Sequence, residues 1–195
     1  MSQVADLEIA ILAFLKAAGH EAGGPLGYDF QTLEPYPQDW EARLVTRPLN
    51  CPAAFVTFAG FTPAASFGSS TSVTAAFGVA VVAKNLRDKA AARQNGPTAN
   101  EVGSLTLQED VSGLVMGRDL GLPIGGLELT NGEFANLSDT MVAAGYSIFA
   151  LRFTTKMTIS ATPFTPSAEF IDDFLSAYGA IGERDTLNLF SQEEA

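Results

Sequence analysis

Apolar residues near the N-terminus recur at three- and four-residue spacing, which is the period of an α-helix. The apolar stripe covers residues 4–18, and Gly19 follows at a position where helices commonly end. A second stretch with the same period covers residues 105–116, and a third covers residues 166–180. The pattern therefore predicts three helices, the last of them on periodicity alone.

Strict alternation of side-chain size predicts a strand over residues 73–84. One face carries the larger side chains, and the other is mostly small, which predicts a helix lying close to the sheet there or the backbone of a partner. Residues 53–60 form an apolar run typical of a buried strand. Residues 142–159 alternate between an apolar and a more polar face, as expected of a half-exposed antiparallel strand.

The remaining segments are predicted as turns and loops. Residues 19–52 are rich in Gly and Pro, and residues 61–71 in Gly, Ser and Thr, so both are expected to be loops. Asn131 and Gly132 stand between short strand-like runs. This pair predicts a type I′ hairpin, because both turn positions of that hairpin need a positive φ.

Together these elements predict an α+β fold with a mainly antiparallel sheet, on which the N-terminal helix and a second helix pack. The 195 residues are 47% hydrophobic and 17% charged, enough to bury a sizeable core. We expect a single domain over residues 1–195. It would carry a mobile basic arm at about 85–100 and an acidic C-terminal segment at about 160–195.

The basic arm is unusual in a chain whose formal net charge is −11. Four cations lie within ten residues, with one acid, Asp88, among them: Lys84, Arg87, Lys89 and Arg93. Four interpretations compete: a solvated loop, a helix cap, a nucleic-acid contact, and an arm that binds an acidic protein surface. The negative charge of the whole chain disfavours nucleic acid. Residues 169–195 carry a net charge of −6, so a neighbouring copy offers a matching acidic surface.

Several other classes of protein are disfavoured by the sequence. Residues 61–83 lack charge over a length that could cross a membrane, but glycine, proline, hydroxyl residues and the period of two argue against a membrane helix. The N-terminus lacks the basic region of a signal peptide, and we expect a soluble chain. Cys51 is the sole cysteine, which excludes an internal disulfide and fits a reducing compartment.

Few residues support catalysis. The sole histidine, His20, stands at a helix end outside any two-histidine zinc motif, and Cys51 has only His20 as a candidate base. Residues 121–126 are glycine-rich but lack the spacing and the lysine of a phosphate-binding loop. The carboxylate pairs at 109–110 and 172–173 are adjacent on predicted helices, so the two side chains of each pair diverge. We expect no enzyme, no cofactor and no metal.

Four pieces of the chain, taken in order, resemble a known family. They are LEIAILAFLKAA, the strand CPAAFVTFAG, the strand running into VVAKNLRD, and LTLQEDVSGLVMGRDLG leading to FALRFTTKM. In this order they are similar to the Mu-type tail-completion proteins, or tail terminators, of contractile-tailed phages. The resemblance covers residues 7–159, and the AKNLR junction and the DVSGLVMG helix are its most telling parts.

The resemblance implies a structural role in the virion. Such proteins form a ring, commonly of six copies, at the head-proximal end of the tail tube, where they end tube and sheath growth and dock the neck. Expected partners are therefore copies of this chain, the tube and sheath proteins, and a neck or head-completion protein, with no membrane and no specific nucleic acid. The chain would assemble in the host cytoplasm. Alternatives are another virion ring component (a head-to-tail connector or tube subunit) and a small ligand-binding protein or hydrolase.

Overall fold

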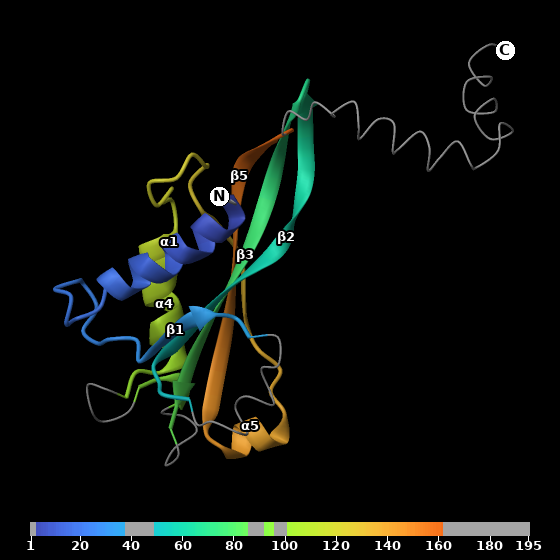
Figure 1. Ribbon diagram of the computed structural model, residues 1–195. Coiled ribbons are helices and arrows are strands. Elements are labelled where there is room, and N and C mark those ends of the chain that lie inside the picture. The colour runs from blue at the N-terminus through green and yellow to red at the C-terminus, as the bar shows by residue number, and fades with distance from the viewer. Residues whose placement is uncertain (1–2, 38–48, 86–91, 96–100, 162–195) are drawn as a thin grey trace, which may run out of the picture. The chain divides into compact units, whose positions relative to one another are not determined.

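A computed structural model describes residues 3–37, 49–85, 92–95 and 101–161 (Figure 1). Contacts divide the chain into two units after Ser160, and the description below concerns the first unit. Its described strands form one five-stranded sheet in the order β1-β2-β3-β5-β4. The strands are β1 Thr32–Pro35, β2 Ala53–Phe67, β3 Ser70–Lys84, β4 Glu128–Phe134 and β5 Tyr146–Ser160. Only the β1–β2 pair is parallel among these strands, so the predicted α+β class with a mainly antiparallel sheet is confirmed.

Two helices cover one face of this sheet, α1 Gln3–Ala17 and α4 Ser104–Val115 (Figure 1). Their bounds lie within one or two residues of those predicted from periodicity. Helix α1 lies over β1 and β2, and α4 lies over β3 and β5. Both bury their apolar stripes in one core on the face that carries the larger side chains of β3, and this core includes Leu7, Ile11, Leu107, Val111 and the alternating residues of β3 from Val73 to Ala83. The alternation in β3 therefore exists because one face carries this core.

The smaller face of β3 receives neither long helix, so within the described part of the chain a close helix is found there only at one end of the strand, and the alternative, the backbone of a partner, stays a prediction. Among the described helices, α5, Asp139–Ala143, is the one that packs on that side, at the end of β3 near Lys84. It contributes Met141 to a second cluster with Phe55, Val82 and Ile148. Residues 142–145, predicted as the start of the last strand, belong to α5 and the turn after it.

The predicted loop at residues 61–71 is wrong, because β2 continues to Phe67 and returns through a turn at Gly68 into β3. The pairing of β2 with β3 shifts register between Phe58 and Gly60 and again between Pro63 and Ala65, and it resumes after each shift. We call residues 61–74 together with 157–160 the neutral tongue. It is the end of the β2–β3–β5 sheet that extends past α1 in Figure 1. The Gly, Ser and Thr residues of this segment suggested a loop, but hydrogen bonding to β3 keeps the backbone extended as a strand.

The predicted hairpin at Asn131–Gly132 is also wrong. Strand β4 passes through both residues, with one register shift between Leu129 and Asn131, and neither residue has a positive φ. A Cβ on Gly132 would lie 3.0 Å from Cε1 of Phe149, so glycine here admits the aromatic ring of the neighbouring strand. Pairing with β5 holds the segment extended and overrides its local turn preference.

Three further expectations have different outcomes. The segment 19–52, expected to be loop, includes the short strand β1. The predicted helix over residues 166–180 and most of the basic arm lie outside the described residues. No helix in the described part of the chain is both long and apolar enough to cross a membrane.

Candidate interaction surface

Lys84, the first cation of the basic segment, is the last residue of β3 and is half-buried. Its ammonium group donates a hydrogen bond to the hydroxyl of Tyr146, its partner in the β3–β5 register, at 3.2 Å. The same group lies 4.6 Å from the centre of the Tyr146 ring. The Tyr146 hydroxyl also accepts the backbone N–H of Leu49 at 3.1 Å. Lys84 therefore joins β3, β5 and the segment before β2.

Arg93 is exposed, and its guanidinium carbon lies 4.4 Å from the centre of the Phe134 ring. Phe134 in turn meets Phe149 edge-on, with ring centres 4.9 Å apart. Arg93 lies between buried Ala92 and Asn95, whose backbone forms an isolated bridge with Val102. The Asn95 side chain accepts the N–H of Gly103 at 2.8 Å, at the start of α4. A cation stacked on an aromatic face is stabilised while its N–H groups stay open to a partner.

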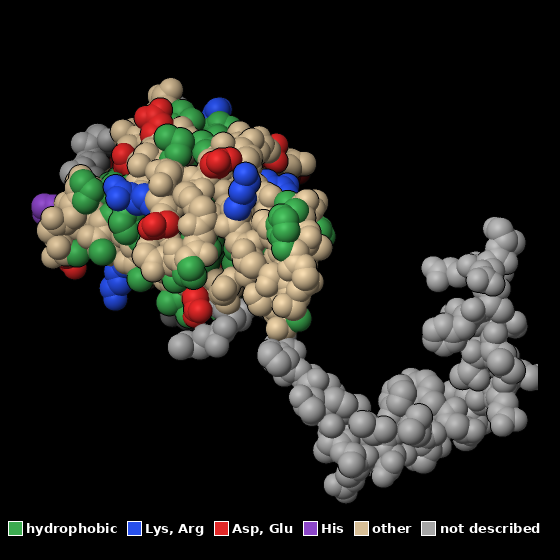
Figure 2. Space-filling model, turned by 90° about the horizontal axis from the view of Figure 1, so that it is seen from above, with side chains coloured by type: hydrophobic (Ala, Val, Ile, Leu, Met, Phe, Trp, Pro, Cys, Tyr) green, Lys and Arg blue, Asp and Glu red, His purple; other side chains and the backbone are tan. Residues whose placement is uncertain are grey.

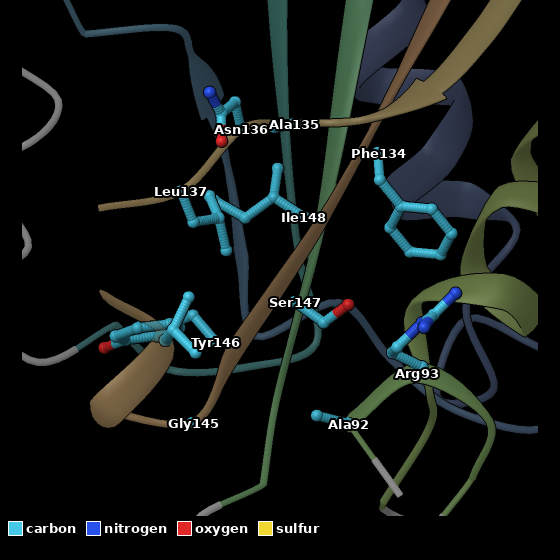
Figure 3. A pocket seen from close by; sticks show the side chains of 11 residues that line it. Ala92, Arg93, Phe134, Ala135, Asn136, Leu137, Gly145, Tyr146, Ser147 and Ile148 are labelled. Carbon is cyan, nitrogen blue, oxygen red and sulfur yellow. The ribbon is translucent and has the colours of Figure 1, made fainter. Parts of the chain in front are cut away.

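A hollow of about 440 Å³ lies beside this stack (Figure 3). In Figure 3 Arg93 and Phe134 point toward one another on one side, with Leu137 and Ile148 opposite and Tyr146 at the far end. Among its described lining residues Arg93 alone is charged, and the others are apolar or uncharged: Ala92, Phe134, Ala135, Asn136, Leu137, Val142, Gly145, Tyr146, Ser147 and Ile148. The surface suits an apolar group that carries a negative charge at its edge.

The structure thus places two of the four predicted interface residues at one end of the sheet. Lys84 packs against the Tyr146 ring, and Arg93 lies at the rim of the hollow. Arg87 and Lys89 lie outside the described residues. The aromatic residues that receive the two cations, Phe134 and Tyr146, were missed by sequence reasoning. They come from β4 and β5, more than 40 positions away along the chain, and only the sheet order brings them to the basic segment.

A second hollow, of about 670 Å³, brings together the residues considered for catalysis, His20 and Cys51, with Lys84. Burial raises the pKa of the Cys51 thiol to about 12, and the lowering effect of Lys84 is smaller. The thiol is therefore protonated at neutral pH, and its sulfur lies 3.9 Å from the carbonyl oxygen of Leu49. A protonated, partly buried thiol is a poor nucleophile.

The carboxylate of Asp110, one of the adjacent acids on α4, accepts a hydrogen bond from the Tyr28 hydroxyl at 3.0 Å. Burial, and then the charge of Asp110, raise the pKa of Tyr28. This contact ties the segment after α1 to α4. Within the described residues no three His, Cys, Asp or Glu side chains gather closely enough to hold a metal ion.

Comparison with known proteins supports the resemblance as far as a Mu-type phage protein. The sequence profile described as "Bacteriophage Mu, Gp37" matches residues 3–158. No curated protein matches the chain. The matched segment includes both long helices and all five described strands apart from the last two residues of β5. It covers well over half of the chain, which therefore belongs to the bacteriophage Mu Gp37 family and is a Mu-type phage protein.

Proposed function

We propose that this chain is a tail-completion protein, which caps the head-proximal end of a phage tail tube, ends growth of tube and sheath, and docks the neck. The observation that carries the proposal is the family match over residues 3–158, which spans the four pieces on which the tail-terminator resemblance rests. Membership in a phage protein family also favours a place in the virion, and the proposal specifies the tail and neck.

The proposal includes a closed ring of identical copies, most simply six, with head-to-tail contacts. The basic segment supports such contacts, since Arg93 stands exposed at the rim of a hollow and the same chain carries a net charge of −6 over residues 169–195. The expected partners are the tube and sheath proteins and a neck or head-completion protein. The proposal involves no catalysis, cofactor, membrane or specific nucleic acid.

Two alternatives predict different observations. A head-to-tail connector or a tube subunit fits the same family and fold, but would occupy another layer of the particle. A small ligand-binding protein is favoured only by the hollow beside Arg93, whose size is within the range of small-molecule sites. A hydrolase that uses Cys51 is disfavoured by the raised pKa of its thiol.

The test is a phage or prophage whose gene for this chain carries an early stop codon, examined by electron microscopy. We expect tails of irregular length that are not joined to heads, and rescue by the chain supplied from a plasmid. An epitope-tagged copy should label one point, at the head-proximal end of each tail. Label along the whole tube would instead identify a tube subunit, label on tail-free heads would identify a connector, and normal particles without the chain would refute a virion role.

A further inference from the structure

The neutral tongue exposes large apolar side chains that no described part of the chain covers. Phe61, Phe67 and Ile159 are 51%, 71% and 41% exposed, and every residue of β2 from Phe61 to Phe67 is exposed. Apolar groups gathered at one end of a molecule in this way commonly mark an interaction site. The tongue therefore requires an occupant.

The tongue is also uncharged, in a chain with a net charge of −11. Residues 49–83 and 157–168 contain no Asp, Glu, Lys, Arg or His. Figure 2 shows this end of the molecule, where the grey residues begin, as tan and green, whereas red and blue side chains lie on the rest of the visible face. A solvated surface normally carries charge, so this composition indicates an interface and not a surface kept in water.

Apolar side chains lie on both faces of the tongue. Phe61 ends a row of rings on the helix-covered face, 6.3 Å from Phe58, which is 5.3 Å from buried Phe77. Ile159 shares that face, because it pairs with Thr71, two residues from buried Val73. Phe67 pairs with Ser70 and so belongs to the opposite face. One flat contact cannot cover both faces, so the tongue suits insertion between surfaces.

The edge of β2 is unsuited to adding another strand. Pro63 has no N–H to donate, and the two register shifts on either side of it interrupt the regular spacing of backbone groups. Contact through side chains on the two faces is therefore favoured over backbone pairing along the edge. Such contacts close on a defined partner and do not propagate as a continuous sheet.

We propose that the neutral tongue inserts against a second copy of this chain, as the main apolar contact between neighbours in the ring; the inference rests on the proposed ring. Identical copies of a chain with a net charge of −11 repel one another. The electrostatic cost of bringing two copies together is smallest where the contact surface carries no charge, as on the tongue. A basic partner would bind most strongly to a surface with acidic side chains. The tongue has none, which disfavours such a partner.

The first test is photocross-linking with p-benzoylphenylalanine in place of Phe67, in an equal mixture of chains with light and heavy nitrogen. We expect cross-linked peptides that join light to heavy chains. We expect few from a control with the same group in place of Met116, which is 56% exposed at the C-cap of α4 and distant from the tongue in sequence. Cross-links confined to single chains, including ones to residues 162–195, would overturn the proposal.

The second test is the mass in solution of the double variant Phe67→Glu with Ile159→Glu, by light scattering over a range of concentrations. Each charge would be buried on assembly, so the concentration for half-assembly should rise at least about tenfold, with an unchanged circular dichroism spectrum. Met116→Glu should assemble like the wild type. If the wild type and the double variant form the same ring, the tongue assignment fails and the ring stands. If the wild type is a monomer throughout, the ring itself fails, and the tongue contact with it.

Discussion

The carboxylate of Glu8 on α1 accepts the backbone N–H of Phe58 on β2 at 2.7 Å, across 50 residues of sequence. Phe58 stands at the first register shift of β2, where the ladder to β3 is interrupted. A helix side chain thus supplies the hydrogen bond at a place where the regular pairing of strands fails. The contact fixes α1 along the sheet at the base of the neutral tongue.

Replacing this carboxylate should destabilise the fold. We expect Glu8→Ala to lower the free energy of unfolding by about 1–2 kcal/mol, because a backbone N–H loses a charged acceptor. Glu8→Gln keeps an acceptor oxygen without the charge and should lose less. Urea unfolding followed by circular dichroism measures both variants. Equal losses for the two variants would contradict this explanation, because the side-chain oxygen that Glu8→Gln keeps would then contribute nothing as an acceptor.

The hydrogen bond between Tyr28 and Asp110 should make stability depend on pH in alkaline solution. The pKa of Tyr28 is raised in the folded state, so above pH about 10 the unfolded chain loses a proton that the folded chain keeps. The contribution of Tyr28 is therefore complete below that pH and declines as pH rises above it. Tyr28→Phe should cost about 1–2 kcal/mol at pH 7. It should also show a shallower decline above pH 10 in thermal unfolding, and an unchanged slope would refute the assignment.

The thiol of Cys51 should react slowly in the folded protein. With a pKa near 12, its thiolate fraction at pH 8 is far below that of an ordinary cysteine. A disulfide reagent should therefore modify the native chain on the order of 100- to 1,000-fold more slowly than the chain in urea. Because the unfolded thiol loses its proton near pH 9 and the folded thiol only near pH 12, the free energy of unfolding should fall between these two pH values. Cys51→Ala should remove the contribution of this thiol to that decrease. Fast modification of the native chain would contradict a buried thiol.

The cations of the basic segment outside the described residues should act in assembly and not in folding. We expect the double variant Arg87→Glu with Lys89→Glu to fold normally but to form rings or dock the neck less well, increasingly so at low salt. Each exposed charge pair is worth only up to about 1 kcal/mol, so the effect should be graded. A matched control, Lys16→Glu with Arg152→Glu, changes the net charge equally at exposed positions on α1 and β5. Equal assembly of both double variants and the wild type, at low and high salt, would leave a solvated loop as the better interpretation.

Periodicity was sufficient for the elements that keep one face in the core over most of their length. Helices α1 and α4 and strands β3 and β5 each keep one face in a continuous core, so their apolar patterns are regular. Strand β1 was missed because four residues are too few to establish a period, and its parallel pairing with β2 exists only in the folded chain. Residues 61–71 were predicted as a loop and Asn131–Gly132 as a turn, because local preference was considered without the neighbouring strand.

The interaction surface was predictable only in its charges. The run from Lys84 to Arg93 is visible in the sequence, and the prediction named its cations. Their aromatic partners were not predictable, because Tyr146 and Phe134 meet them only through the order β3-β5-β4. Nor does the sequence show that Lys84 is engaged within the fold while Arg93 remains exposed beside a hollow.

The register between β3 and β5 also has a consequence during synthesis. Strands β2 and β3 are consecutive and can form a hairpin as soon as both are synthesised. The other neighbour of β3 is β5, whose paired residues follow 62 positions later at Lys84–Tyr146 and 90 positions later at Ser70–Ser160. At about 5–20 residues per second, a ribosome needs roughly 3–18 s to cover that distance. For that time the β2–β3 hairpin, whose single charged residue is Lys84 at the end of β3, has one unpaired edge on β3. Burial of that edge by β5 is then expected to limit the rate of folding, because the pairing closes the largest loop in the sheet.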